Sequence, residues 1–315
     1  MSSNVTISII SMNNGHMLTR CLDSIINLTK GTDYEIVVVA YLFDKQVLNE
    51  FIIKYLTVKF IVNDEITGFA ENNNIILKQS KSKYFFVLND DTYFENDLIT
   101  NLITTLETLD KSVAFISPVL YYPDGRVQFN GREKYTWIDY ILVKLHIEKL
   151  RFKLRHSNKC GIYQSYNISG ACFLVKSEVM KELGFFNEKY FFCPEDIELS
   201  TLANERGFKV YVDTNLSITH IHEATSTSIK AAISPIATFG TIDFVSRNSM
   251  IILVILKLFT LIISVTKLLL SLFNFNKNTR KIQFYSMYWT IKYMFTWLSY
   301  KELFIILYNQ VKTMK

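Results

Sequence analysis

Hydrophobic and polar positions alternate along the N-terminal half of the chain so that strands and helices are predicted in turn. Short runs rich in β-branched residues predict strands at 5–10, 34–40, 58–62, 84–88 and 113–117. Between them, apolar residues at helical spacing predict helices at 17–26, 45–55, from 70 onward and at 96–109. The alternation predicts an α/β fold with a mostly parallel, doubly wound sheet.

The pattern is less regular after Pro118. A strand is expected at 166–175, a short helix at 179–183 and a strand at 210–212. The basic, apolar stretch 132–159 allows three interpretations: a flap over a site, a membrane-touching helix or a plain surface helix.

The strand predicted at 84–88 ends in Asn89, Asp90, Asp91 and Thr92. In open α/β sheets ligands bind beyond the carboxyl ends of the strands, so these side chains are candidates for holding a divalent metal. The alternative is structural, because Asp, Asn and Thr also favour turns and helix caps.

A polar loop from 63 to 74 contains one glycine, Gly68, before Phe69 and an asparagine run that includes Asn73. Backbone N–H groups at such a helix start can receive a phosphate or a sugar hydroxyl. A plain asparagine-rich helix cap is the structural alternative.

A second acidic pair, Glu195 and Asp196, follows an aromatic segment and a proline. A carboxylate placed there at the rim of a pocket gains basicity from partial desolvation. The alternative is a helix N-terminus, where proline and acids are both favoured.

Two further positions are candidates for the same site. Gly170, within a predicted strand, suggests close approach by another backbone or a ligand. His220 and His222 would share one face of a strand, so one of them can join a metal with the first acidic group; such pairs are also often structural.

Together, these blocks resemble a bacterial glycosyltransferase of family 2 with the GT-A fold, of the rhamnosyltransferase-like kind. The resemblance covers roughly residues 5–228 and lies in the order of its blocks: 5–10 with 21–25, 68–70 with 73–74, 88–92, 169–172, 183–188, 191–196 and 220–227.

The resemblance implies an inverting enzyme that moves a sugar from a nucleotide-diphosphate donor to a saccharide hydroxyl. It implies Mg²⁺ or Mn²⁺ held by Asp91, Asn89 and His220, and a general base, Asp196 or, as second choice, Glu195. The donor-side positions are Asn13, Asp44, Gly68, Phe69, Asn73 and Asp90, and the acceptor-side positions are Gly170 and Ala171.

The chain departs from the family pattern after the second predicted strand. The family usually has Asp-Asn-Gly-Ser-x-Asp, whose first Asp holds the nucleotide base, whereas this chain has Ala40 at that place and only Asp44 or Tyr41 as substitutes. A nonenzymatic GT-A-like scaffold or partner subunit with a degenerate donor site is therefore the alternative function. A metal-dependent hydrolase would also use Asp90, Asp91 and His220.

Cysteine usage and the N-terminus bear on the compartment. The four cysteines are widely spaced without a Cys-x-x-Cys pair, which favours neither a disulfide framework nor a zinc site. The first residues lack a signal-peptide pattern. A cytoplasmic protein is expected.

The C-terminal part is basic and apolar together. Residues 247–315 carry a formal charge of +9, and since the whole chain carries +5, the first 246 residues carry −4. This combination favours an anionic membrane surface and excludes nucleic acid as the expected partner.

We therefore expect two domains, a GT-A domain at 1–246 and a membrane-associated helical tail at 247–315, peripheral on the inner face of the cell membrane. The segment 250–273 is apolar except for Lys257 and Lys267, and it can lie in the membrane plane, span the bilayer or form a soluble core helix. A helical hairpin packed on the catalytic domain, or a homodimer, is the structural alternative. Membrane association makes a lipid-linked saccharide the expected acceptor.

Overall fold

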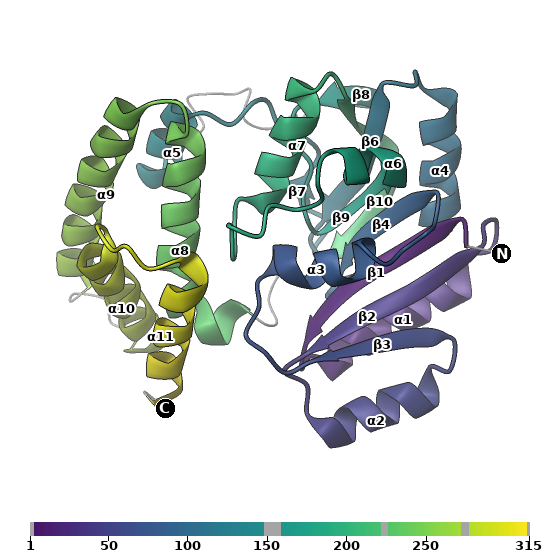
Figure 1. Ribbon diagram of the computed structural model, residues 1–315, viewed down its shortest axis with the longest axis horizontal. Helices are drawn as coiled ribbons and strands as arrows, with labels where there is room; N and C mark the ends of the chain where they lie inside the picture. Colours follow the sequence, from purple (N-terminus) through teal and green to yellow (C-terminus); the bar gives the residue numbers. More distant parts are fainter. Residues whose placement is uncertain (1–2, 148–158, 222–225, 272–276, 314–315) are drawn as a thin grey trace. The chain divides into compact units, whose positions relative to one another are not determined.

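The computed structural model describes residues 3–147, 159–221, 226–271 and 277–313 (Figure 1). The chain forms two compact units: a sheet unit of 1–134, 155–187 and 195–224, and a helical unit of 135–154, 188–194 and 225–315. The predicted boundary between a GT-A domain and a helical tail at residue 247 stays a prediction. In the structure, the residues from 225 to 246 group with the later helices.

The sheet unit begins with the predicted alternation of strands and helices. Its first elements are β1 (Val5–Met12), α1 (Gly15–Leu28), β2 (Tyr34–Tyr41), α2 (Lys45–Lys54), β3 (Val58–Asn63), α3 (Phe69–Leu77), β4 (Tyr84–Asn89), β5 (Thr92–Tyr93), α4 (Leu98–Thr108) and β6 (Val113–Tyr121). The remaining elements are β7 (Val127–Phe129), β8 (Ile162–Ser165), β9 (Cys172–Lys176), α6 (Ser177–Glu182), α7 (Glu195–Glu205) and β10 (Lys209–His220).

The strands form one mixed sheet in the order β3-β2-β1-β4-β9-β6-β10-β5, with β7 paired to β6 and β8 to β10. The pairs β1–β2, β2–β3, β1–β4 and β6–β10 are parallel, and β9 runs antiparallel between β4 and β6. The predicted α/β fold is therefore confirmed. The strand expected at 166–175 is shorter and antiparallel to its neighbours.

Helices cover both faces of the sheet, which explains why β4 is apolar throughout. Phe86 and Leu88 belong to the core cluster that includes α1, α2 and α4. Phe85 and Val87 belong to the second cluster, which includes α3, α6 and α7. Alternate side chains of a strand point to opposite faces, so a strand buried on both sides needs apolar residues at every position.

The carboxyl ends of β1 and β4 meet where the strand order reverses. The chain runs from β1 outward through β2 to β3, and then returns to pair β4 on the other side of β1. Ile10 of β1 is in register with Asn89 of β4, so the residues that follow each strand lie at the same edge. This is the switch point at which ligands bind in open α/β sheets.

The helical unit contains α5 (Trp137–Lys144), α8 (Ser226–Ser246), α9 (Met250–Ser271), α10 (Lys277–Tyr293) and α11 (Tyr300–Thr313). The segment 188–194 packs in the same unit, where Phe191 stacks on Phe304 with ring centroids 4.4 Å apart. A side chain at Gly240 of α8 would place its Cβ 2.5 Å from the carbonyl oxygen of Cys193, so only glycine permits this approach.

One helix among the described residues, Met250–Ser271, is long and apolar enough to cross a membrane. Only 17% of the most apolar 18-residue stretch of this helix is buried, whereas the core helix of a soluble protein is mostly buried.

A buried asparagine links α3 to the turn after α6. The side chain of Asn74 donates to the carbonyl oxygen of Phe186 at 2.9 Å and accepts from its N–H at 3.1 Å. Asn74 is 1% exposed and Phe186 is 2% exposed, so water cannot replace these bonds without disrupting the packing.

We predict that Asn74→Ala lowers the free energy of unfolding by about 2–4 kcal/mol, because it leaves one buried donor and one buried acceptor unpaired. Urea denaturation of the purified protein measures this change. Asn101→Ala, on the exposed side of α4, is the matched control and should change stability by less than about 0.5 kcal/mol. Equal unfolding midpoints for the two variants would show that the Asn74 bonds are not structural.

Candidate active site

Asp90 lies at the switch point, in a buried turn between β4 and β5. Ser11 Oγ, from the end of β1, donates to Asp90 Oδ2 at 2.6 Å. Burial raises the pKa of Asp90 to about 7; the Ser11 hydrogen bond opposes this rise and the charge of Asp91 adds to it. Asp90 therefore ties β1 to β4 with a carboxyl group that can be neutral near physiological pH.

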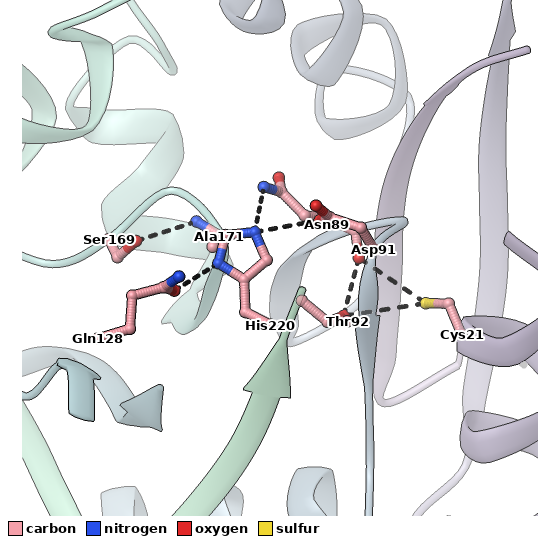
Figure 2. A network of polar contacts seen from close by, with 8 residues as sticks. All are labelled: Cys21, Asn89, Asp91, Thr92, Gln128, Ser169, Ala171 and His220. Carbon is pink, nitrogen blue, oxygen red and sulfur yellow. Dashed lines mark hydrogen bonds and ion pairs between the residues drawn. The ribbon is translucent and has the colours of Figure 1, made fainter. Parts of the chain in front are cut away.

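Asp91 faces His220, which the sequence places far away. The short strand β5 pairs antiparallel with the end of β10, with Thr92 opposite His220. The N–H of Ile221 also donates to the carbonyl oxygen of Asp91 at 2.9 Å. As a result, Asp91 Oδ1 lies 3.1 Å from His220 Nε2 (Figure 2).

The other ring nitrogen of His220 is held by Gln128 of β7. The distance from His220 Nδ1 to Gln128 Oε1 is 2.5 Å. Because an amide oxygen only accepts, Nδ1 carries the proton in this arrangement, and Nε2 is left to face Asp91 and, at 3.4 Å, Asn89 Nδ2 (Figure 2). Sequence reasoning missed Gln128, which stands in no recognisable motif.

The Asp91–His220 contact needs a proton or a cation between its two atoms. A carboxylate oxygen and an unprotonated imidazole nitrogen are both acceptors, so at 3.1 Å they repel unless a proton or a metal cation lies between them. Adjacent ligands of an octahedral ion with bonds of about 2.1 Å are about 3 Å apart, so this pair fits Mg²⁺ or Mn²⁺. Among the described residues no group of three or more His, Cys, Asp or Glu side chains could hold an ion.

Gly170 and Ala171 connect this group to the second acidic pair. The N–H of Asn89 donates to the carbonyl oxygen of Ala171 at 2.9 Å, and the N–H of Gly170 donates to Asp196 Oδ2 at 2.8 Å. A methyl group at Gly170 would lie 3.4 Å from Asp196 Cβ and 3.6 Å from Phe69 Cε1. The predicted acceptor-side residues therefore lie against Phe69 on one side and Asp196 on the other.

Asp196 and Glu195 open α7, so the structural interpretation of this pair as a helix N-terminus holds as well. Glu195 is buried, whereas Asp196 is partly exposed. Asp196 Oδ1 accepts from the N–H of Ile197 at 2.8 Å while its Oδ2 accepts from Gly170. These two bonds fix the carboxylate beside Gly170.

The donor-side loop is held by buried asparagines. Gly68 is the N-cap of α3, and Phe69 begins the helix. Asn73 is fully buried; its side chain accepts from Ser8 Oγ at 2.7 Å and donates to the carbonyl oxygen of Phe69 at 3.0 Å. The donor contact predicted for Asn73 stays a prediction, and the geometry gives this side chain the task of fixing Phe69.

Asn13 and Asp44 lie beyond the carboxyl ends of β1 and β2, next to each other. Asn13 Oδ1 accepts from the N–H of Asp44 at 3.0 Å, and Asp44 Oδ1 accepts from the N–H groups of Gln46 and Val47 as the cap of α2. Asn13 and Leu42 both have φ of 48°, a strained conformation for leucine. A nucleotide contact by Asn13 or Asp44 remains a prediction.

Most of the predicted site residues thus gather at one edge of the sheet. Asn89, Asp91 and His220 form one group, and Phe69, Gly170, Ala171 and Asp196 adjoin it through the Asn89–Ala171 bond. His222 lies outside the described residues.

Comparison with known proteins identifies the family. The sequence model described as glycosyl transferase family 2 matches residues 6–184. The chain belongs to glycosyl transferase family 2. No curated protein matches it significantly in sequence.

Solved structures share the fold of this family 2 chain at low sequence identity. One is GalNAc-T7 in a crystal structure with UDP, GalNAc and Mn²⁺ (TM-score 0.55, 18% identity, 70% of this chain and 44% of that one). Another is the mannosyltransferase PcManGT from Pyrobaculum calidifontis, in complex with GDP-Man and Mn²⁺ (TM-score 0.52, 13% identity, 100% and 88%). A third is S. aureus TarS, residues 1–349 (TM-score 0.50, 15% identity, 94% and 73%).

The family and the GT-A type of fold are therefore confirmed, and the resemblance to the rhamnosyltransferase-like subgroup stays a prediction. The chain spans less than half of the length of GalNAc-T7. At these identities the structural likeness establishes the fold alone.

The raised pKa of Asp90 predicts a pH-dependent stability for the metal-free protein. The folded state binds this proton more tightly than the unfolded state, so stability should fall as the pH rises from about 4 to about 7. Asp90→Asn should remove about 2–4 kcal/mol of this change. Urea unfolding at pH 5 and pH 8 in the presence of a chelator measures it.

Asp33→Asn is the control, because Asp33 is exposed and precedes β2 at the amino end of the sheet. It should keep the wild-type pH profile. If Asp90→Asn and the wild type lose the same stability between pH 5 and pH 8, Asp90 does not hold the shifted proton.

Proposed function

We propose that the protein is an inverting glycosyltransferase that moves a sugar, a hexosyl or rhamnosyl group, from a nucleotide-diphosphate donor to a hydroxyl of a saccharide acceptor. The observation that carries the proposal is the Asp91–His220 pair, held by Gln128 at the switch point and joined through Ala171 and Gly170 to Asp196. We infer that the reaction contributes to bacterial cell-surface polysaccharide.

The donor side of the proposal rests on chemistry that the residues fit. Asp91 Oδ1 and His220 Nε2 would hold Mg²⁺ or Mn²⁺, with Asn89 beside them, and donor oxygens and water would complete the coordination. When bound, the ion supplies Lewis-acid stabilisation to the departing diphosphate. The likeness to structures that contain Mn²⁺ with UDP or GDP-Man supports this donor class.

On the acceptor side, Asp196 takes the proton of the attacking hydroxyl. Its carboxylate is fixed by hydrogen bonds from the Gly170 and Ile197 N–H groups. The side chain would therefore lose little conformational entropy when it faces the acceptor. A single in-line displacement by that hydroxyl inverts the anomeric centre. Phe69 lies against Gly170 and would limit the space available to the transferred sugar.

The alternative function is a nonenzymatic GT-A-like scaffold or partner subunit. Two observations favour it. The place of the base-binding carboxylate of the family is taken by Ala40, which is fully buried, and Asp44 Oδ1 is engaged in capping α2. A scaffold would bind no nucleotide sugar with or without Mn²⁺, so donor binding separates the two functions.

We further propose that the protein works on the cytoplasmic side of the cell membrane as a peripheral protein and takes a lipid-linked saccharide as acceptor. The +9 charge of residues 247–315 and the exposed apolar helix α9 support this location. The same surface is also compatible with a homodimer, which a measurement of molecular mass in solution would detect.

A thermal-shift screen of nucleotide sugars with Mn²⁺ tests the proposal first. A donor at 100 times its dissociation constant should stabilise the fold by about 2.7 kcal/mol. If no donor raises the melting temperature, the scaffold is the better description.

With a donor in hand, Asp196→Asn should keep the thermal shift but lower the rate of transfer by about 10²- to 10⁴-fold, because it removes the base and not the ion. Asp91→Ala should lose both, with the rate falling by about 10²-fold or more. The readout is release of the nucleotide diphosphate together with a product that carries a new glycosidic bond of inverted configuration. Asp33→Asn should behave as the wild type. Hydrolysis of the donor without any glycoside product would instead favour a hydrolase.

Gln128 offers a test of the His220 geometry. We predict that Gln128→Ala weakens Mn²⁺ binding by about 10- to 100-fold, since the imidazole loses the hydrogen bond that fixes its tautomer. Calorimetric titration with Mn²⁺ and donor measures the affinity. Gln164→Ala, at an exposed position of β8, is the matched control. Unchanged affinity in Gln128→Ala would exclude His220 as an oriented ligand.

A further inference from the structure

The outward side of α9 is almost entirely apolar. Ten of its side chains are exposed, and the one polar residue among them, Thr266, donates its hydroxyl to the carbonyl oxygen of Ile262 on its own helix. The other nine exposed side chains are Met250, Ile251, Val254, Ile255, Leu258, Ile262, Val265, Leu269 and Leu270.

Apart from Thr266, the hydroxyl residues of α9 point inward. Thr260, Ser264 and Ser271 are buried, and Thr260 Oγ1 shares a 2.7 Å hydrogen bond with Tyr140 Oη of α5. The two lysines of the helix are only partly exposed.

Each lysine finds a partner inside the helical unit. Lys267 Nζ donates to the carbonyl oxygen of Lys144 at 3.3 Å and lies 3.2 Å from His146 Nε2. Lys257 Nζ lies 5.6 Å from the centroid of the Phe295 ring. Lys267 is thus held by α5 and the residue that follows its end, whereas Lys257 lies over Phe295, whose ring is itself exposed.

This polarity is the reverse of that of a helix on a water-exposed surface. A water-soluble helix buries its apolar stripe and turns lysines and hydroxyls outward. In α9 the hydroxyls of Thr260, Thr266 and Ser271 are bonded within the helical unit and the exposed side chains carry no charge, so this side is matched to an apolar partner. The stripe is too long and continuous to be scattered surface residues.

Other apolar groups of the helical unit are exposed on α5, which packs on α9, and in the loop that contains Phe295 and Trp297. Phe295, placed near α9 by Lys257, is 61% exposed, and Trp297 is fully exposed in the loop before α11. Helix α5, which packs on α9, exposes Ile138 and Val143. Exposed aromatic residues next to an aliphatic surface are typical of the headgroup region of a bilayer.

We propose that this lipid-facing surface, formed by the outward side of α9 with Phe295 and Trp297, inserts into one leaflet of an anionic bilayer, with α9 parallel to the membrane plane. The proposal rests on the membrane location included in the proposed function and names the surface that produces it. Its in-plane orientation follows from the inward side of α9, where Lys267 bonds to the end of α5 and which α5 covers in part.

Charge favours lipid over a second copy of the chain as the occupant. Residues 247–315 carry +9, so two copies placed face to face would repel, whereas an anionic headgroup layer attracts the same charge.

Vesicle binding of the full chain, measured without donor or metal, tests this surface independently of catalysis. The protein should sediment with phosphatidylglycerol-containing vesicles and less with neutral phosphatidylcholine vesicles. The double variant Ile255→Glu with Ile262→Glu should lower the partition coefficient at least tenfold, which is about 1.4 kcal/mol or more. The matched control is Ile52→Glu with Ile53→Glu, two exposed isoleucines of α2 in the sheet unit.

Tryptophan quenching by brominated lipids gives a second measure. Of the three tryptophans, Trp289 is 1% exposed, Trp137 of α5 is 37% exposed and Trp297 is fully exposed. The measurement therefore uses a Trp137→Phe background, in which quenching should occur and then largely disappear when Trp297→Phe is added. Absence of vesicle binding, or equal loss in the α2 control, would overturn the proposal. So would a dimer in solution that the α9 double variant dissociates, since the occupant would then be a second copy. Circular dichroism of each variant verifies that it is folded.

Discussion

The site depends on one main-chain hydrogen bond, from the N–H of Asn89 to the carbonyl oxygen of Ala171. It lies at the end of the antiparallel β4–β9 ladder, and β4 is also the last strand of the parallel group β3-β2-β1-β4. In a purely parallel sheet, the carboxyl end of β4 would lie only beside the carboxyl ends of its neighbouring strands. The antiparallel partner begins where β4 ends, and it therefore brings Gly170, with Asp196 bonded to it, next to Asn89 and the Asp91–His220 pair.

The first half of the fold could be predicted from the sequence because its elements are strongly periodic and buried on two faces. The strand at 84–88 and the acids after it follow from local pattern alone. The short strands β5 and β7 could not be predicted in this way, since two or three residues give no period. Helix α8 was also missed; it contains Pro235, which argues against a helix in any local assignment.

The same limit applies to the site. Asp91 and Asp196 were recognisable because carboxylates at strand and helix ends are chemically conspicuous. Gln128 was not, because its function arises only from the pairing of β7 with β6, which places an amide beside His220. Asn73 shows the converse case: its residue type suggested a ligand contact, and the structure uses it to connect Ser8 with the backbone of Phe69.

The division of the chain into units has a consequence for how such a protein can be altered by recombination. The helical unit is not a terminal module, because it also includes 135–154 and 188–194, which interrupt the sequence of the sheet unit. Exchanging only the C-terminal part between two relatives would pair new helices with the resident 188–194 segment, whose Cys193 carbonyl must fit against Gly240. The C-terminal helices and the 188–194 segment are therefore expected to be inherited together, because each contributes one side of the close contact between Gly240 and Cys193.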